Sequence, residues 1–239
     1  MEEEIVKPFR ETVEDLYKLH YVTRQYEHYV RINPETLKLF EATKFVYAYF
    51  AFNSFYNYDW ETSLEEKKLT DYEGKTIEID GKVRAFGDTD KYKRMSDFII
   101  SKIDVADIDE FFRLIIQANP KQPNYERKIQ SIIENINSIT EDSRIDESMK
   151  MNFINSFREL LETRKIKKGD FKKQILYFVY MVRNNIFHGA KNTIQMSENR
   201  QRKRLEIYAN ILIATNEMLF RVLQREKIFE PQQSYRINI

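Results

Sequence analysis

The sequence predicts an all-α protein, a helical bundle with one small inserted β-hairpin. Three observations support this fold class. Apolar residues recur at spacings of three and four along most of the chain, which is typical of amphipathic helices. Only 5 glycines and 5 prolines interrupt the 239 residues, and 42% of the residues are hydrophobic, enough for a sizeable core. Because no linker, internal repeat or low-complexity segment divides the chain, we expect a single domain over residues 1–239.

Two helices are expected in the first quarter of the chain. The first spans about residues 8–30, because Pro8 suits the first turn of a helix. The second begins after Asn33, since an asparagine cap followed by Pro34 is a helix-start signal. The apolar residues of the second helix lie on several sides of it and predict burial on more than one face: Leu37, Phe40, Phe45, Tyr49, Phe52 and Tyr56.

The aromatic cluster at residues 45–60 permits two interpretations. Aromatic rings can stack on the bases of a single-stranded nucleic acid. Rings at helical spacing more often pack in a core, and we favour that interpretation. Asn57, Tyr58 and Trp60 lie beyond the periodic part, so we expect them to be exposed.

A β-hairpin is predicted over about residues 75–86. Residues 76–79, Thr-Ile-Glu-Ile, alternate with the period of two that a strand requires. Asp80-Gly81 follows directly and favours a two-residue turn between antiparallel strands. We therefore expect the hairpin to be inserted between helices.

Six helical segments are predicted after the hairpin from their apolar spacing. Gly169-Asp170 is expected to separate two of them, so that the fifth starts at Phe171. The last is expected to be capped near Ser197 and to run toward Pro231. The apolar positions lie within 92–102, 108–116 (stopped at Pro120), 125–136, 149–161, 171–187 and 205–222, of which the first two are expected to be consecutive segments.

The basic residues are concentrated in one part of the chain. Residues 164–204 hold twelve lysines and arginines but only two acidic residues, a net charge of +10, whereas the whole chain carries +1. The remainder of the chain therefore carries −9. A bound polyanion accounts for such a bias, and so does a solvated basic face.

Several kinds of site are excluded or disfavoured. The chain has no cysteine, which excludes disulfides, thiolate zinc sites and cysteine nucleophiles. It has no glycine-rich phosphate loop and no metalloprotease or hydrolase motif. His20 and His28 share one face of the first expected helix, but Arg24 lies between them, which disfavours a metal site. We expect neither a metal nor a cofactor.

The stretch "FVYMVRNNIFHGAKN", residues 178–192, ends an apolar helix with an arginine, two amides and a histidine. Arg183 and His188 are five residues apart, about 140° of rotation and ~7.5 Å of rise on a strict helix, so they would not converge. Gly189 can end the helix and reorient His188. Alternatively, a second copy of the chain supplies the missing groups across a two-fold axis.

These residue types suit the cleavage of RNA. A histidine accepts and donates protons near neutral pH, and an arginine offers two donors to phosphate oxygens. Asn184 is placed to orient either the histidine or the phosphate. The structural alternative is that Arg183 and His188 only bond the free carbonyls at the negative end of a helix.

The sequence Arg-Asn-Asn-Ile-Phe-His-Gly at 183–189 resembles the signature of the HEPN superfamily. That signature is an arginine, a polar residue that is often asparagine, and a histidine four to six positions after the arginine. The local sequence looks like the stand-alone HEPN proteins of prokaryotic toxin and antiviral defence systems. The resemblance implies a HEPN-like helical bundle with additional helices, homodimerisation through the motif helices, and metal-independent cleavage of RNA by its 2′-OH group.

On this resemblance, Arg183 and His188 are expected to be catalytic and Asn184 to support them in a composite site of the homodimer. The basic residues that follow are expected to bind the RNA substrate through its backbone: Lys191, Arg200, Arg202, Lys203 and Arg204. Some HEPN domains lack activity. The alternative is therefore a HEPN-like module that binds RNA, a nucleotide or a protein without cleaving it.

The expected partners are RNA, a second copy of the chain and an antitoxin or other regulatory protein. HEPN toxins paired with a nucleotidyltransferase antitoxin typically carry a tyrosine two residues after the histidine, and this chain has Ala190 there. Regulation by modification of that tyrosine is therefore not expected. The acidic N-terminus lacks an apolar signal core, and the apolar run 175–182 is too short to span a membrane, so we expect a cytoplasmic protein with no membrane contact.

Overall fold

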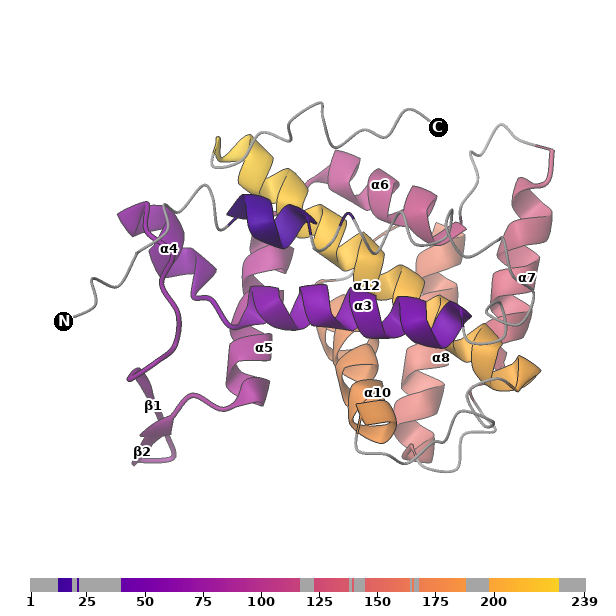
Figure 1. Cartoon of the computed structure of the whole chain (residues 1–239). Helices are drawn as coiled ribbons and strands as arrows, with labels where there is room; N and C mark the ends of the chain where they lie inside the picture. Colours follow the sequence, from indigo (N-terminus) through magenta and orange to yellow (C-terminus); the bar gives the residue numbers. More distant parts are fainter. Residues whose placement is uncertain are drawn as a thin grey trace.

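The computed structural model of the chain is mostly helical, with one two-stranded sheet (Figure 1). The structure describes residues 13–18, 21, 40–116, 123–137, 139, 145–163, 165, 168–187 and 198–227. For residues 183–187 it describes the backbone only. The expected helical character and the inserted hairpin are thus confirmed for the described residues. Of the first expected helix, residues 13–18 are helical, and most of the remainder lies outside the described residues.

Helix α12 (Asn199–Arg225) runs through the middle of the described structure and packs against α3, α5, α6, α7 and α10. Of its 27 residues, 18 are buried, so it is enclosed on nearly all sides, as a core helix is. It begins after Glu198, whose side chain makes no capping hydrogen bond, and it ends at Arg225, short of Pro231. The expected cap, Ser197, lies outside the described residues.

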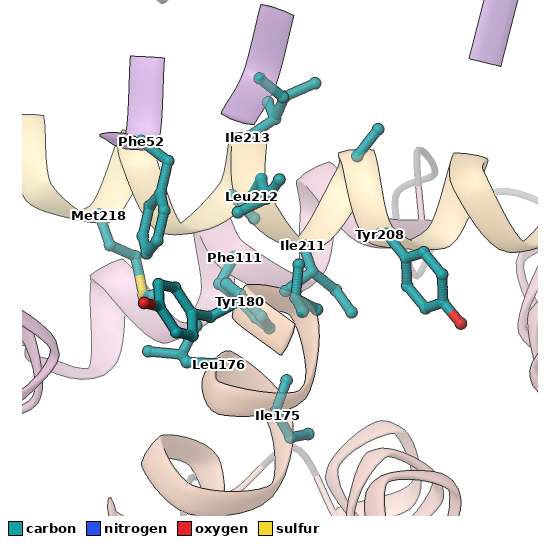
Figure 2. Packing of buried hydrophobic residues seen from close by; sticks show 14 of the residues in the cluster. Phe52, Phe111, Ile175, Leu176, Tyr180, Tyr208, Ile211, Leu212, Ile213 and Met218 are labelled. Atoms are coloured by element: carbon teal, nitrogen blue, oxygen red, sulfur yellow. The ribbon is translucent and has the colours of Figure 1, made fainter. Parts of the chain in front are cut away.

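Helix α3 (Phe40–Tyr56) lies along α12, and its burial on several sides is confirmed. Phe55 meets Phe220 edge to face, with ring centroids 5.0 Å apart. Tyr56 of α3 meets Tyr180, on the helix that carries the motif, edge to face with ring centroids 6.2 Å apart. Figure 2 shows Tyr180 with Phe52 of α3 and Met218 of α12 in the same buried cluster. Most aromatic residues of α3 therefore form core rather than a surface for bases, namely Phe45, Tyr49, Phe52, Phe55 and Tyr56, whereas Phe50 is exposed.

Helices α5 (Asp88–Lys102) and α6 (Val105–Ile116) are joined by two residues. Asp104 and Asp107 each accept a hydrogen bond from the other's backbone N–H at 3.0 Å, which starts α6. Asp107 is 1% exposed and accepts from Arg221 and Arg225 of α12, both at 3.0 Å. This ion pair holds the start of α6 on the C-terminal end of α12.

Helices α7 (Tyr125–Asn137) and α8 (Glu147–Thr163) agree with their expected positions. Helix α7 packs against α6, α8 and α12. Helix α8 packs against α7, η2 and α10 and buries six residues on one stripe: Lys150, Phe153, Ile154, Phe157, Leu160 and Leu161. Their spacing of three and four is the amphipathic pattern that predicted the helix.

The helix before the motif differs from its prediction. It comprises α9 (Lys168–Asp170), the π-helix η2 (Phe171–Leu176) and α10 (Tyr177–Phe187) without a break. The start at Phe171 is therefore wrong, because Gly169 lies inside the helix. In η2 the N–H of Tyr177 donates to the carbonyl of Lys172, five residues back rather than four. Apolar spacing does not distinguish this register from an α-helix over so short a segment.

Strands β1 (Thr76–Ile79) and β2 (Lys82–Ala85) form the expected antiparallel hairpin, with Ile79 opposite Lys82. Asp80 and Gly81 both have positive φ, 52° and 73°, as a two-residue turn of this hand requires. Figure 1 shows the hairpin standing away from the helical body. Its residues are almost all exposed.

One helix and one buried residue escaped the sequence analysis. Helix α4 (Trp60–Glu66) starts at Asp59, whose carboxylate accepts from the N–H of Thr62 at 3.4 Å. Trp60 is 2% exposed, and its indole N–H donates to the carbonyl of Phe55 at 2.8 Å. The expectation that Trp60 is exposed is wrong, because the chain turns back after α3 and covers the ring.

The packing of α10 leads to a first prediction. Phe178 stacks on Phe153 with centroids 4.2 Å apart, and both rings are fully buried. Phe178→Ala should lower the free energy of unfolding by about 3–5 kcal/mol, measured by urea denaturation, because it leaves a cavity between two helices. Phe50→Ala on α3 is the matched control, since Phe50 is 46% exposed and should cost about 1 kcal/mol or less. Equal losses would contradict the assignment of Phe178 to the core.

The junction of the hairpin with α5 leads to a second prediction. Arg84 donates to both carboxylate oxygens of Asp90, at 2.6 and 3.0 Å, and the N–H of Gly87 adds a third bond at 3.0 Å. The Arg84 bond lowers the pKa of Asp90 below its usual value, against the opposing effect of burial. A lowered folded pKa means that ionised Asp90 stabilises the fold at neutral pH, and that this contribution is lost as pH falls through that pKa.

Asp90→Asn should therefore lower the melting temperature at pH 7, and the gap to wild type should shrink as the pH is taken from about 5 toward 3. Asp109→Asn, which removes an exposed carboxylate from α6, should reproduce the wild-type profile. A gap for Asp90→Asn that stays constant with pH would contradict the role assigned to the ionised carboxylate.

Candidate functional site

The first part of the motif lies on a helix, as expected. Arg183 and Asn184 belong to α10 (Tyr177–Phe187), and the described residues of this segment stop at Phe187. The side chains of Arg183 and Asn184, and residues 188–197 with His188 and Lys191, lie outside the described residues. Whether the guanidinium and the imidazole converge is therefore untested, and their catalytic roles stay predictions.

The core fixes the helix that carries the motif. The spacing predicts a core-facing stripe of Ile175, Phe178, Val179, Val182 and Ile186. The first four are buried, and the side chain of Ile186 lies outside the described residues. Phe178 contacts both Phe153 of α8 and Tyr208 of α12, with the second pair of centroids 5.9 Å apart. The helix is thus packed between two others up to the turn before Arg183. This support limits how far the start of the motif can move.

A cluster of tyrosines lies on the α5 side of this helix, and the sequence analysis missed it. Tyr180 stacks on Tyr92 of α5 with centroids 4.5 Å apart, and Tyr177 stacks on Tyr180 at 6.1 Å. The hydroxyl groups of Tyr180 and Thr89 lie 3.4 Å apart. Tyr177 and Tyr180 are three residues apart, and this spacing was the available signal. This signal was easy to miss, because both tyrosines lie within an apolar run that predicts a core helix.

The structure sorts the predicted RNA-binding residues by exposure. Arg200 and Lys203 are exposed on the first turns of α12. Arg202 is half-buried and donates to both carboxylate oxygens of Glu41 on α3, at 3.0 and 3.2 Å. Arg204 is only 7% exposed. Arg202 and Arg204 therefore serve the packing of α12, which leaves Arg200 and Lys203 as the described residues that are accessible to a phosphate.

The Glu41 contact also stabilises the charged form of Arg202. The hydrogen bond raises the pKa of the guanidinium further above its usual value. The planar fork of arginine favours this two-bond geometry with a carboxylate. The pair joins the start of α3 to the start of α12.

Metal and membrane sites were also sought in the described part of the chain. It contains no group of three or more histidine, aspartate or glutamate side chains that could hold a metal ion. His20, Arg24 and His28 lie outside it. No helix within the described ranges is long and apolar enough to cross a membrane.

Comparison with known proteins adds no relative to this picture. A scan against protein-family models, a search of curated proteins and a search of solved structures each found no match.

The exposure of the basic residues gives a third prediction. Arg202→Ala should lower the free energy of unfolding by about 1 kcal/mol, because it leaves the largely buried carboxylate of Glu41 without this partner. Lys203→Ala should change it by less than about 0.5 kcal/mol, because its side chain is exposed. Urea denaturation measures the free energy of unfolding of both variants. A larger loss of stability for Lys203→Ala than for Arg202→Ala would contradict the division into packed and exposed basic residues.

Proposed function

We propose that the protein is a metal-independent endoribonuclease of HEPN type, acting as a homodimer in a toxin or antiviral defence role. The observation that carries the proposal is the Arg-Asn-x3-His sequence at the end of an apolar, core-packed helix, within a segment of net charge +10. Arg183 and Asn184 lie on helix α10 in the described part of the chain, which is the helical setting that the proposal assumes.

The proposed reaction needs two proton transfers and one centre of positive charge. The 2′-oxygen attacks the adjacent phosphorus as His188 of one subunit accepts the 2′-OH proton. The bond from phosphorus to the 5′-oxygen breaks as the protonated imidazole of the second subunit donates a proton to that oxygen. Arg183 stabilises the charge that develops on the phosphate oxygens. The products are a 2′,3′-cyclic phosphate and a 5′-hydroxyl, and DNA, which lacks the 2′-OH, resists.

The basic surface supports the same proposal. Lys172 and Lys173 on η2, with Arg200 and Lys203 on α12, place positive charge on the elements that precede and follow the motif. Lysine and arginine contacts neutralise backbone phosphates and do not depend on the base sequence. Because such contacts are electrostatic, the affinity for RNA should fall as the salt concentration rises. They account for the charge bias whether or not the chain cleaves what it binds.

The second candidate is a non-catalytic HEPN-like module that binds RNA, a nucleotide or a protein. The basic segment favours it as much as it favours the enzyme. If the protein is such a module, it binds labelled RNA at low salt, and the RNA remains intact over hours. If Arg183 and His188 only build a dimer interface, their substitution changes the oligomeric mass without changing affinity for RNA.

The decisive experiment compares wild type with His188→Ala and Arg183→Ala on single-stranded RNA in EDTA. We expect wild type to yield products ending in a 2′,3′-cyclic phosphate. Each variant should lose at least about 100-fold in rate, since general acid–base catalysis contributes on that order. The same strand made of DNA should remain intact.

Arg127→Ala on α7 is the matched control, because it removes an exposed arginine outside the basic segment and should cleave as wild type does. All variants should keep the wild-type melting temperature and oligomeric mass. Cleavage that survives His188→Ala, or that requires a divalent ion, would reject the proposed mechanism.

A further inference from the structure

A surface cavity of about 290 Å³ lies between α5 and the helix that carries the motif. Two of its lining residues, Tyr92 and Lys93, come from α5, and three, Lys172, Lys173 and Tyr177, come from η2 and the start of α10. Its volume is close to the lower end of the range for small-molecule sites. We infer that this cavity binds a nucleotide, with the phosphate on the lysines and the base against Tyr177.

The charge of the cavity favours a phosphate. Lys172 is paired with the exposed carboxylate of Asp97. Neither Lys93 nor Lys173 forms an ion pair within the described ranges, and both are exposed. Lys93 contributes to the lowered pKa of Asp90, whose carboxylate is already bonded to Arg84. The ammonium groups of Lys93, Lys172 and Lys173 therefore outnumber the one carboxylate that pairs with them, that of Asp97. The remaining positive charge attracts an anion.

The aromatic wall favours a base. Tyr177 is only half-buried, and its ring is 6.1 Å from both Tyr92 and Tyr180. Tyr92 and Tyr180 stack on each other and thereby hold the Tyr177 ring from behind before any ligand arrives. A preformed aromatic surface beside lysines is the combination that single-stranded nucleic-acid sites use. A simple anion would gain nothing from the ring.

The π-helix explains how these groups come together. Lys172 and Tyr177 are five residues apart, and in an α-helix they would point about 140° away from each other. In η2 the carbonyl of Lys172 accepts from the N–H of Tyr177, so the two residues lie one above the other and line the same cavity. Single π-turns occur frequently at functional sites. Here the turn gives a lysine and a tyrosine one common face.

The cavity wall that Tyr92 forms holds a buried hydroxyl group. This hydroxyl finds no hydrogen-bond partner of acceptable geometry in the described part of the chain. Burial raises the pKa of Tyr92 well above its usual value, against a smaller effect of the Ser96 hydroxyl, so the group keeps its proton. Tyr92 therefore lines the cavity as an uncharged ring.

This inference does not rest on the proposed ribonuclease. Tyr177 precedes Arg183 by six residues, about 9 Å along the helix axis, so the cavity is separate from the motif. A nucleotide held here is either a free molecule or one unit of an RNA strand, and both present the same ring and phosphate.

The test is calorimetric titration at low salt with adenosine 5′-monophosphate, which contains no bond that the proposed enzyme could cleave. We expect binding to weaken about tenfold in Lys173→Gln and in Tyr177→Leu, as the loss of one stacked or charged contact implies. Tyr177→Phe keeps the ring and should stay within about twofold of wild type. Lys165→Gln, an exposed lysine of the same basic segment, is the matched control and should bind as wild type does.

Further arms identify the ligand. Adenosine and inorganic phosphate, each carrying half of the recognised chemistry, should both bind more weakly than the monophosphate. A 2′-O-methylated hexanucleotide that binds more tightly than the monophosphate assigns the site to an RNA strand, and the reverse order assigns it to a free nucleotide. No detectable binding of any nucleotide, or equal binding by wild type and Lys173→Gln, overturns the inference. Phosphate binding as tight as that of the monophosphate overturns the role of Tyr177.

Discussion

The burial of α12 on nearly all its sides is the constraint on which the rest of the structure depends. A helix with so few exposed positions has to be enclosed, and α3, α5, α6, α7 and α10 enclose it. Each contributes an apolar stripe, so the hydrophobic effect, rather than any single polar contact, holds the helices together. The ion pairs act at the ends: Asp107 with two arginines at the C-terminal end of α12, and Glu41 with Arg202 at its start.

The same enclosure determines how the candidate site is supported. The helix from Lys168 to Phe187 is held by α8 and α12 on its apolar side and by α5 on its tyrosine side. Core packing therefore fixes the helix up to the turn before Arg183. The π-helix η2 precedes α10 within this continuous helix. It changes which residues share a face without interrupting the helix.

Local signals predicted the fold well where one side chain or one turn decides the structure. The hairpin followed from Asp80-Gly81, and α8 followed from its apolar spacing. The sequence failed where distant segments decide. Trp60 is buried and donates to the carbonyl of Phe55, and the π-helix η2 packs against α5 and α8, neither of which the local sequence indicates. Arg204 is buried although arginines are usually exposed, because a long aliphatic stem can pack in a core. For the candidate site, the buried apolar stripe of the helix that carries Arg183 was predictable, whereas the tyrosine cluster beside it was not.

The hairpin has a practical consequence for work on this chain. It projects from the helical body, and the contacts that fix it are local to its base: Arg84 with Asp90, and the ring of Phe86 beside Tyr72. An extra peptide inserted between Asp80 and Gly81 would therefore disturb only solvent-exposed backbone. That turn offers a place for a fluorophore or an affinity handle on a molecule whose two chain ends need not be altered.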